Sequence, residues 1–203
     1  MTLFDFFNIT GLIAFAVSGV YKGIKKEFDI LGVTILGFLT AFGGGILRDI
    51  IVNRIPVVLT GYMDIFFATG GIISGILFYK IFKKDISTST TVKIFDAIGL
   101  AAFTVSGAIV GIDAGLNLVG VILLAVLTGT GGGMISDVLT GEVPFILKED
   151  VYATCSIAGA FILFILTKTF SFSPESAGFF SLTFTLTLRL TAIYKNWHLP
   201  RFE

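Results

Sequence analysis

Seven long apolar segments, separated by short polar ones, limit the folds open to this chain. Each runs for roughly 17–24 residues, and a helix needs about 20 mostly apolar residues to cross a bilayer. Charged residues make up only 14% of the sequence, whereas soluble domains contain about 25%. The sequence therefore predicts an all-α integral membrane protein with seven transmembrane helices, at 4–21, 30–52, 62–81, 92–112, 116–139, 151–167 and 176–194.

The start of the seventh helix and the retention of the first can also be predicted. Ser173 suits the N-cap, Pro174 the first helical position and Glu175 the first turn, because each residue type is favoured at its place. The first apolar segment lacks a basic start and a small-residue cleavage site, so we expect it to remain as a helix.

Basic residues are divided unevenly between the two sides of the membrane that these helices would create. One side receives ten Lys and Arg residues and the other receives two. Because the side rich in basic residues faces the cytoplasm, the N-terminus is predicted outside and the C-terminus inside a cell membrane. The rich side holds Lys22, Lys25, Lys26, Lys80, Lys83, Lys84, Lys93, Lys148, Lys195 and Arg201; the poor side holds Arg54 and Lys168.

Composition excludes several classes of function. The formal net charge is zero, which argues against binding of nucleic acid. Cys155 is the only cysteine and His198 the only histidine, so neither a disulfide nor a metal cluster of these residues is expected. No nucleophile–base pair is evident. The chain is expected to need no cofactor, not to be an enzyme, and to have the lipid bilayer as its partner.

An internal repeat becomes visible when the sequence is shifted by 88 residues. Between positions 5 and 59 this offset gives 21 identities in 55 pairs without a gap. Apolar composition alone does not pair glycine triads, aspartates and prolines at one constant offset, so the repeat indicates internal symmetry. The matched pairs include Ser18 with Ser106, Thr40 with Thr128, Asp49 with Asp137, and Pro56 with Pro144.

Each repeat contains three of the predicted helices. An odd number forces the second copy to enter the membrane in the opposite orientation, which gives a pseudo-two-fold axis in the membrane plane, a device of many transporters. We therefore expect one membrane domain (1–203), composed of a first repeat (4–84), an inverted second repeat (92–168) and a seventh helix (174–195) that packs against them.

Three consecutive glycines lie inside the second helix of each repeat: Gly43, Gly44 and Gly45, and then Gly131, Gly132 and Gly133. Glycine weakens a helix by about 1 kcal/mol relative to Ala, and irregular backbone in a membrane must be buried or border water. A kink that lines a hydrated path is one interpretation. Close packing of helices on small residues is the other, and the polar residues that follow each triad favour the kink.

Those polar residues define the candidate site. Thr40, Gly44 and Arg48 are spaced by four, as are Thr128, Gly132 and Ser136, so each trio lies on one helix face. Asp49 and Asp137 follow, and charges inside a bilayer usually mark a pathway. Since Ser136 replaces Arg48, Asp137 is expected to provide unpaired negative charge that favours cations. Arg48 would gate the outer half, or would form an ion pair with Asp49 or Asp137.

The remaining polar residues are expected to have simpler roles. Ser18 and Ser106 either form hydrogen bonds between helices or line the path. Asp64, Asp96 and Asp113 lie near the ends of predicted helices and are expected at the membrane surface. Arg189 is close enough to a helix end for its long side chain to reach the interface.

In these features the sequence resembles the trimeric intracellular cation (TRIC) channels, in their prokaryotic branch. The resemblance rests on the seven segments, the inverted repeat, the two glycine triads, and Arg48, Asp49 and Asp137. It implies a homotrimer in which each protomer has its own pore, kinked at these glycines, that conducts monovalent cations, chiefly potassium. Animal relatives carry a Lys-Glu-Val-type motif for a phosphoinositide where this chain has glycines, so a lipid requirement is not implied.

Two functions remain for such a chain. The first is a cation channel in which glycine carbonyls and Asp side chains replace the hydration of potassium or sodium. The alternative is a secondary transporter of a small solute such as glycine, since the same prokaryotic family is also labelled as glycine transporters. Inverted repeats and broken helices suit both.

Overall fold

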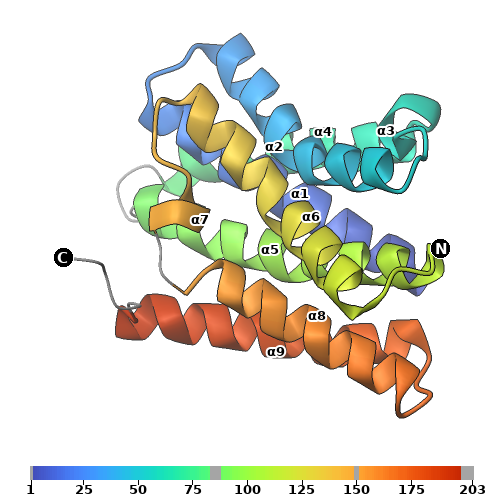
Figure 1. Cartoon of the computed structure of the whole chain (residues 1–203). Coiled ribbons are helices and arrows are strands. Elements are labelled where there is room, and N and C mark those ends of the chain that lie inside the picture. Colours follow the sequence, from blue (N-terminus) through green and yellow to red (C-terminus); the bar gives the residue numbers. More distant parts are fainter. Residues whose placement is uncertain (1, 83–87, 149–150, 198–203) are drawn as a thin grey trace.

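The computed structural model describes residues 2–82, 88–148 and 151–197, which form nine α-helices and no strand (Figure 1). The helices are α1 (Leu3–Lys25), α2 (Ile30–Ile51), α3 (Val57–Thr60), α4 (Met63–Phe82), α5 (Thr88–Asp113), α6 (Leu118–Leu139), α7 (Phe145–Lys148), α8 (Ala153–Lys168) and α9 (Pro174–Lys195). Each predicted segment coincides with a long helix, and α3 and α7 are single turns that the sequence did not predict.

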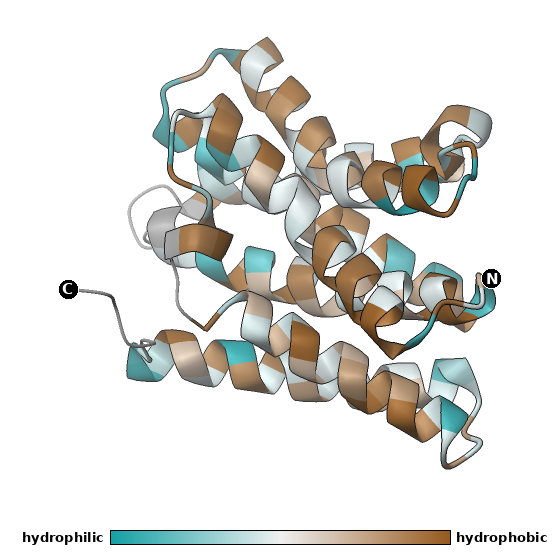
Figure 2. Cartoon of the chain, viewed as in Figure 1, coloured by the Kyte–Doolittle hydropathy of each residue, from teal (hydrophilic) through white to brown (hydrophobic). Residues whose placement is uncertain are grey.

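Six of the described helices, α1, α2, α4, α5, α6 and α9, are long and apolar enough to cross a membrane. The seventh predicted segment corresponds to α8, which is apolar but has only 16 residues. At 1.5 Å per residue it is about 24 Å long, somewhat less than a hydrocarbon core. Apolar residues dominate the helices, whereas hydrophilic ones gather mainly near the helix ends and connections (Figure 2).

Side-chain caps start several helices, and two of them lie at positions related by the 88-residue offset. Asp29 precedes α2 and accepts a hydrogen bond from the Gly32 amide at 2.7 Å; Asn117 precedes α6 and accepts one from Gly120 at 2.9 Å. Ser173 caps α9, with Pro174 at its first position, as predicted. Such caps satisfy amides that have no partner within the helix.

Helices α1 and α5 form the centre of the molecule and pack along each other, with α2 and α6 crossing beside them. Helix α4 packs on α1, while α8 and α9 pack on α5 (Figure 1). The window of α5 that would cross a membrane is 83% buried, so lipid could reach little of it. The start of α1 and the end of α9 lie at opposite ends of the helix bundle (Figure 1).

The contacts between α1 and α5 are reciprocal under the same offset. A methyl group added to Gly11 would meet the Phe103 ring, and one added to Gly99 would meet Phe15. The two phenylalanine rings contact each other, with centroids 5.3 Å apart. Each glycine therefore makes room for the aromatic ring of the other helix. Phe15 and Phe103 are fully buried.

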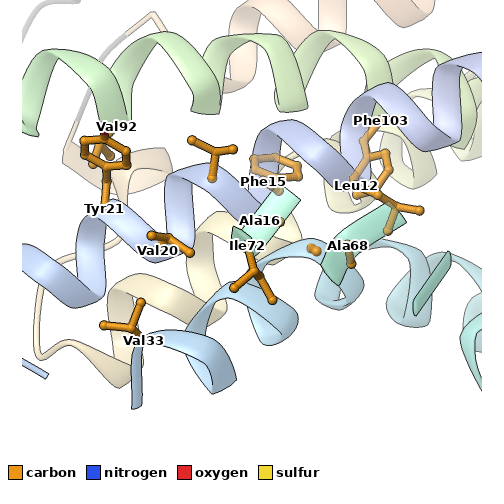
Figure 3. Packing of buried hydrophobic residues seen from close by; sticks show 12 residues of the cluster. Leu12, Phe15, Ala16, Val20, Tyr21, Val33, Ala68, Ile72, Val92 and Phe103 are labelled. Carbon is orange, nitrogen blue, oxygen red and sulfur yellow. The ribbon is translucent and has the colours of Figure 1, made fainter. Parts of the chain in front are cut away.

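A hydrophobic cluster on α1 fixes the first three long helices to one another (Figure 3). Val20 and Tyr21 of α1 lie between Val33 of α2 and Val92 of α5, while Ile72 of α4 packs nearby. All of these side chains are at most 4% exposed. Burial from several sides leaves α1 little freedom to rotate, which fixes the direction of its few polar side chains.

Candidate functional site

The glycine triads do not interrupt their helices. Helices α2 and α6 are helical throughout Ile30–Ile51 and Leu118–Leu139. A methyl group on Gly44 would collide with the Thr128 carbonyl oxygen, and one on Gly132 with the Thr40 carbonyl oxygen. Backbone thus packs directly on backbone where the two helices cross. Close packing on small residues, one of the two interpretations, describes this crossing, and a kink at the triads stays a prediction.

Of the other glycines of the triads, the first of each lies at the helix crossing and the third lies near polar groups. Added methyl groups on Gly43 and Gly131 would come within 3.2 Å and 3.1 Å of the glycine Cα atoms of the opposite helix. Gly45 would meet only the Arg48 guanidinium, at 4.0 Å, and Gly133 would meet Asp96 and a tyrosine hydroxyl, each at 3.3 Å. The third glycine of each triad therefore faces polar groups.

Arg48 donates hydrogen bonds to three polar side chains, and a fourth side chain is linked to it through Asn8. Its Nε donates to Asp49 Oδ1 at 2.8 Å, and its Nη1 donates to Ser106 Oγ at 2.6 Å and Asn8 Oδ1 at 3.4 Å. Asn8 in turn donates to Asp64 Oδ1 at 3.1 Å. Of the two carboxylates considered as partners from the sequence, Arg48 pairs with Asp49. We call these five residues the Arg48 cluster.

A small cavity borders the Arg48 cluster. Its volume is about 10 Å³ and its lining includes Asn8, Gly45, Arg48, Asp49 and Asp64. A space of this size holds about one water molecule. The carboxylate of Asp64 therefore lines an internal space, and its side chain is partly buried. Asp64 lies at a helix end, as expected, and its side chain also faces this space.

Lys22 of α1 forms the second cluster, with Ser136 and Asp137 of α6. Its ammonium group donates to Asp137 Oδ1 at 2.6 Å and to Ser136 Oγ at 2.9 Å, and lies 4.7 Å from the centre of the Phe145 ring. Lys22 is 6% exposed and Asp137 is fully buried. Asp137 therefore has a basic partner, and the expectation of unpaired negative charge there is wrong. We call Lys22, Ser136 and Asp137 the Lys22 cluster.

Asp49 and Asp137 have a shared second role. The other carboxylate oxygen of Asp49 accepts from the Val57 amide at 3.1 Å, and that of Asp137 accepts from the Phe145 amide at 2.9 Å. Val57 and Phe145 begin α3 and α7. Each aspartate therefore ties a short helix to the end of the preceding long one.

Asp96 and Tyr152 occupy the positions that Asn8 and Asp64 hold in the first half of the chain, 88 residues earlier. Asp96 is fully buried and Tyr152 is 1% exposed. Asp96 lies in α5, which extends eight residues before it, so the expectation of a surface position is wrong. Asp113, at the last residue of α5, is exposed as expected.

Arg189 of α9 also points inward. It is 2% exposed, its Nη1 donates to the Val151 carbonyl at 3.0 Å, and its guanidinium lies 4.8 Å from the centre of the Tyr152 ring. The expectation that this side chain extends to the interface is wrong. Arg189 instead connects α9 to the start of α8.

The hydroxyl residues of the predicted site have different roles. Thr40 and Thr128 donate to the carbonyls four residues earlier, Leu36 and Leu124, both at 2.6 Å. Their side chains are thus satisfied within their own helices. Ser106 binds Arg48 from another helix, as one of its two interpretations predicted. Its counterpart Ser18 is buried, with no hydrogen-bond partner for Oγ among the described residues.

A second, exposed ion pair lies one helical turn from Lys22. Lys26 Nζ is 3.0 Å from Glu142 Oε1, and both side chains are about one-third exposed (33% and 34%). The hydrogen bond from Lys26 is the main reason that the pKa of Glu142 lies below its ordinary value. An acid with a lowered pKa in the folded state stabilises that state above its unfolded pKa, and the stabilisation is lost as pH falls through the folded value.

Glu142→Gln is therefore expected to reduce the loss of stability that acid causes below about pH 4.5, near the pKa of an unfolded glutamate. The effect should be at most about 1 kcal/mol because the pair is exposed, and it should shrink at high salt. Thermal unfolding of the purified protein between neutral and acidic pH measures it, with Glu27→Gln as an exposed control. Equal acid sensitivity of Glu142→Gln and the wild type would contradict it.

Five residues in or beside these clusters were not recognised from the sequence. Lys22 was assigned to the membrane surface, Asp64 and Asp96 to helix ends, and Asn8 and Tyr152 were not considered. The repeat contained the missing signal, because polar residues occur at both members of two equivalent pairs, Asn8 with Asp96 and Asp64 with Tyr152. Lys22 has no such signal, since its counterpart is Val110.

Known proteins share both the sequence pattern and the fold of this chain. The family model described as "Glycine transporter" matches residues 5–81 and 93–168. The chain belongs to this family. The matched residues include both triads, the whole Arg48 cluster and the whole Lys22 cluster.

A relative and two solved structures extend this assignment. The UPF0126 membrane protein YvgT of Bacillus subtilis is 38% identical over 97% of this chain and 95% of its own length. A structure that describes conductance through TRIC cation channels is 38% identical, with a TM-score of 0.87 over 100% of this chain and 98% of the other. The TRIC trimeric intracellular cation channel orthologue from Rhodobacter sphaeroides is 27% identical, with a TM-score of 0.86 over 97% and 100%.

These comparisons show what kind of protein this Glycine transporter family member is. It is a multi-pass membrane protein with the fold of prokaryotic TRIC channels, and it is not an enzyme. The resemblance noted from the glycine triads and the Arg48, Asp49 and Asp137 positions is confirmed.

Proposed function

We propose that the protein is a channel for monovalent cations, mainly potassium, with a pathway inside each protomer beside the α2–α6 crossing. The observation that carries this proposal is the presence of two buried ionic clusters at opposite ends of the α2–α6 pair, one around Arg48 and one around Lys22. Buried ionisable groups in a membrane protein are costly and usually border a path for ions. The likeness to TRIC cation channels supports the same function.

The arrangement in the membrane that we propose has seven crossings, with α8 as the short sixth. Reciprocal contacts, such as Gly44 with Thr128 and Gly132 with Thr40, support two inverted three-helix repeats followed by α9. The excess of basic residues on one side supports an outer N-terminus and a cytoplasmic C-terminus. Of these basic residues, Lys83, Lys84 and Arg201 lie outside the described residues, as do His198 and the Lys148 side chain.

In this conformation the proposed path is closed. At the crossing, Gly44 and Gly132 lie against opposite backbone carbonyls, and the rings of Phe15 and Phe103 meet between α1 and α5. Conduction therefore requires α2 and α6 to separate enough for water to enter. Glycine carbonyls freed by that movement would replace part of the hydration of an ion. The Lys22 and Arg48 clusters, which close the two ends, would have to rearrange at the same time.

We also propose that the protein forms a homotrimer through α2 and α6. Both helices leave equivalent apolar side chains exposed, at positions related by 88 residues: Leu31 and Val119, Ile35 and Leu123, Ile50 and Val138, and Ile51 and Leu139. Exposed apolar faces in a membrane contact either lipid or another subunit. The relative from Rhodobacter sphaeroides is a trimeric channel, which supports the second possibility for this chain.

Current recording from purified protein in a planar bilayer tests the channel. With a gradient of KCl across the bilayer, discrete current steps should reverse close to the potassium equilibrium potential. Replacing potassium by the bulky cation N-methyl-D-glucamine on one side should abolish the inward or outward current from that side. Reversal near the chloride potential, or the absence of steps from correctly folded protein, would contradict the proposal.

A second candidate, a carrier of a small solute such as glycine, is favoured by the description of the matching family model. Proteoliposomes with the same protein separate the two. A carrier should give saturable uptake of labelled glycine and no discrete current steps, whereas a channel should give the steps and no saturable uptake.

A further inference from the structure

Asp96 is the buried acid that neither ionic cluster explains. It is fully buried in α5, and neither of its carboxylate oxygens has a hydrogen-bond partner among the described residues. Asp49 and Asp137, by contrast, each use both oxygens. An ionised carboxylate without partners is costly to bury. In native proteins such a group is normally satisfied by water or a bound ion, or it serves a function.

A second unpartnered oxygen faces the same point. The hydroxyl of Tyr152 is buried and has no partner in full hydrogen-bond geometry among the described residues, but it lies near enough to interact with the Asp96 carboxylate. A methyl group on Gly133 would lie 3.3 Å from Asp96 Oδ1 and 3.3 Å from Tyr152 Oη. Both oxygens therefore lie close to the face of α6 at Gly133, where even a methyl group would be crowded. Carboxylate and other oxygen ligands suit hard cations.

The charged groups around Asp96 determine how tightly a cation would be held. Lys22 is bound to Asp137 and Ser136, and Arg189 donates to the Val151 carbonyl; both act on Asp96 electrostatically, as does Asp137. The positive charges of Lys22 and Arg189 thus nearly balance the negative charges of Asp96 and Asp137. A monovalent ion at Asp96 would be held weakly, as a permeant ion must be if it is to leave again.

We propose that Asp96 and Tyr152, next to Gly133, provide ligands for a monovalent cation on the Lys22 side of the α2–α6 crossing. The proposal rests on the proposed channel function, because the permeant ion is the ligand. The equivalent place near Arg48 differs, since there Asn8 donates to Asp64 and so uses one oxygen of that carboxylate. The site therefore belongs to one end of the path only.

Cation-dependent stability of the purified protein in detergent tests the site without requiring conduction. KCl is increased at constant ionic strength, with N-methyl-D-glucamine chloride making up the difference. A ligand that binds only the folded state raises its stability, so the wild-type midpoint of thermal unfolding should rise by about 5 °C. Asp96→Asn should remove this rise, and the matched variant Asp64→Asn should retain it.

Gly133→Ala provides a second test should Asp96→Asn fold poorly. It keeps every charge and places a methyl group next to both oxygens, so it should also remove the potassium-dependent rise. Either a wild-type midpoint that does not respond to potassium, or a full response in both Asp96→Asn and Gly133→Ala, would overturn the site. The second result would mean that Asp96 holds a proton or a water molecule.

Bilayer currents from the same preparations separate this inference from the channel proposal. Potassium-selective current steps, together with an unfolding midpoint that does not change with potassium, would contradict the binding site and support the channel. If the midpoint depends on potassium, Asp96→Asn removes that dependence, and the protein passes no current, the binding site would be supported and the channel function contradicted.

Discussion

Gly132→Ala is expected to lower the midpoint of thermal unfolding by about 6–12 °C, which corresponds to about 3 kcal/mol in a protein of this size. The added methyl group would collide with the Thr40 carbonyl oxygen. That oxygen belongs to the backbone of α2 and cannot move as a side chain can. The helices must therefore separate, and the surrounding contacts of α2 and α6 are lost with them. Thermal unfolding of the protein in detergent measures the effect.

Two other glycines provide matched controls for this experiment. Gly45→Ala adds a methyl group whose nearest neighbour is the Arg48 guanidinium at 4.0 Å, and Gly70→Ala adds one with nothing within 4 Å. Both should leave the midpoint unchanged or raise it, because Ala favours helix over Gly. Gly44→Ala should behave like Gly132→Ala because the crossing is reciprocal. A Gly132→Ala variant as stable as Gly45→Ala would contradict the close packing of the triads.

Lys22→Met should lower the free energy of unfolding by about 3–5 kcal/mol. The substitution removes the ammonium group that lies 2.6 Å from Asp137 Oδ1 and leaves a carboxylate buried without its counter-charge. Met fills a similar volume, so the loss of charge rather than a cavity should dominate. The loss should be seen as a lower midpoint of thermal unfolding.

The exposed pair next to Lys22 provides the control for this variant. Lys26→Met breaks the pair with Glu142, whose side chains are about one-third exposed, and should change stability by at most about 1 kcal/mol. Lys22→Met combined with Asp137→Asn should recover part of the loss, because the buried charge is then absent. Equal effects of Lys22→Met and Lys26→Met would show that the Lys22–Asp137 pair is not the buried contact described above.

The positions of the long helices could be predicted from the sequence for a local reason. In lipid a spanning segment must satisfy its backbone within itself, so length and apolar content of each segment are enough to locate it. Caps are also local, and Ser173 and Pro174 correctly marked the start of α9. The repeat is encoded in the same way, because an offset of 88 residues needs only the sequence. These features did not depend on how the helices meet.

The candidate site was predicted only in part because its contacts join distant segments. The triads, Arg48, Asp49, Ser136 and Asp137 were found, but the pairing of Lys22 with Asp137 spans 115 residues. Spacing along one helix predicts a shared face, not the residue that the face meets. Asp96 was placed at the surface because it lies only four residues after the predicted start of its helix at position 92, whereas α5 begins at Thr88.

The glycine triads separate what the sequence determines from what only the tertiary structure decides. The sequence by itself determined that two equivalent helices carry three small residues each, followed by polar side chains. Whether those residues open toward water or toward another backbone depends on the distance and angle between α2 and α6. The tertiary structure decided this orientation by bringing Gly44 and Gly132 against the Thr128 and Thr40 carbonyls. Packing between two helices is set by all their neighbours together and not by either helix alone.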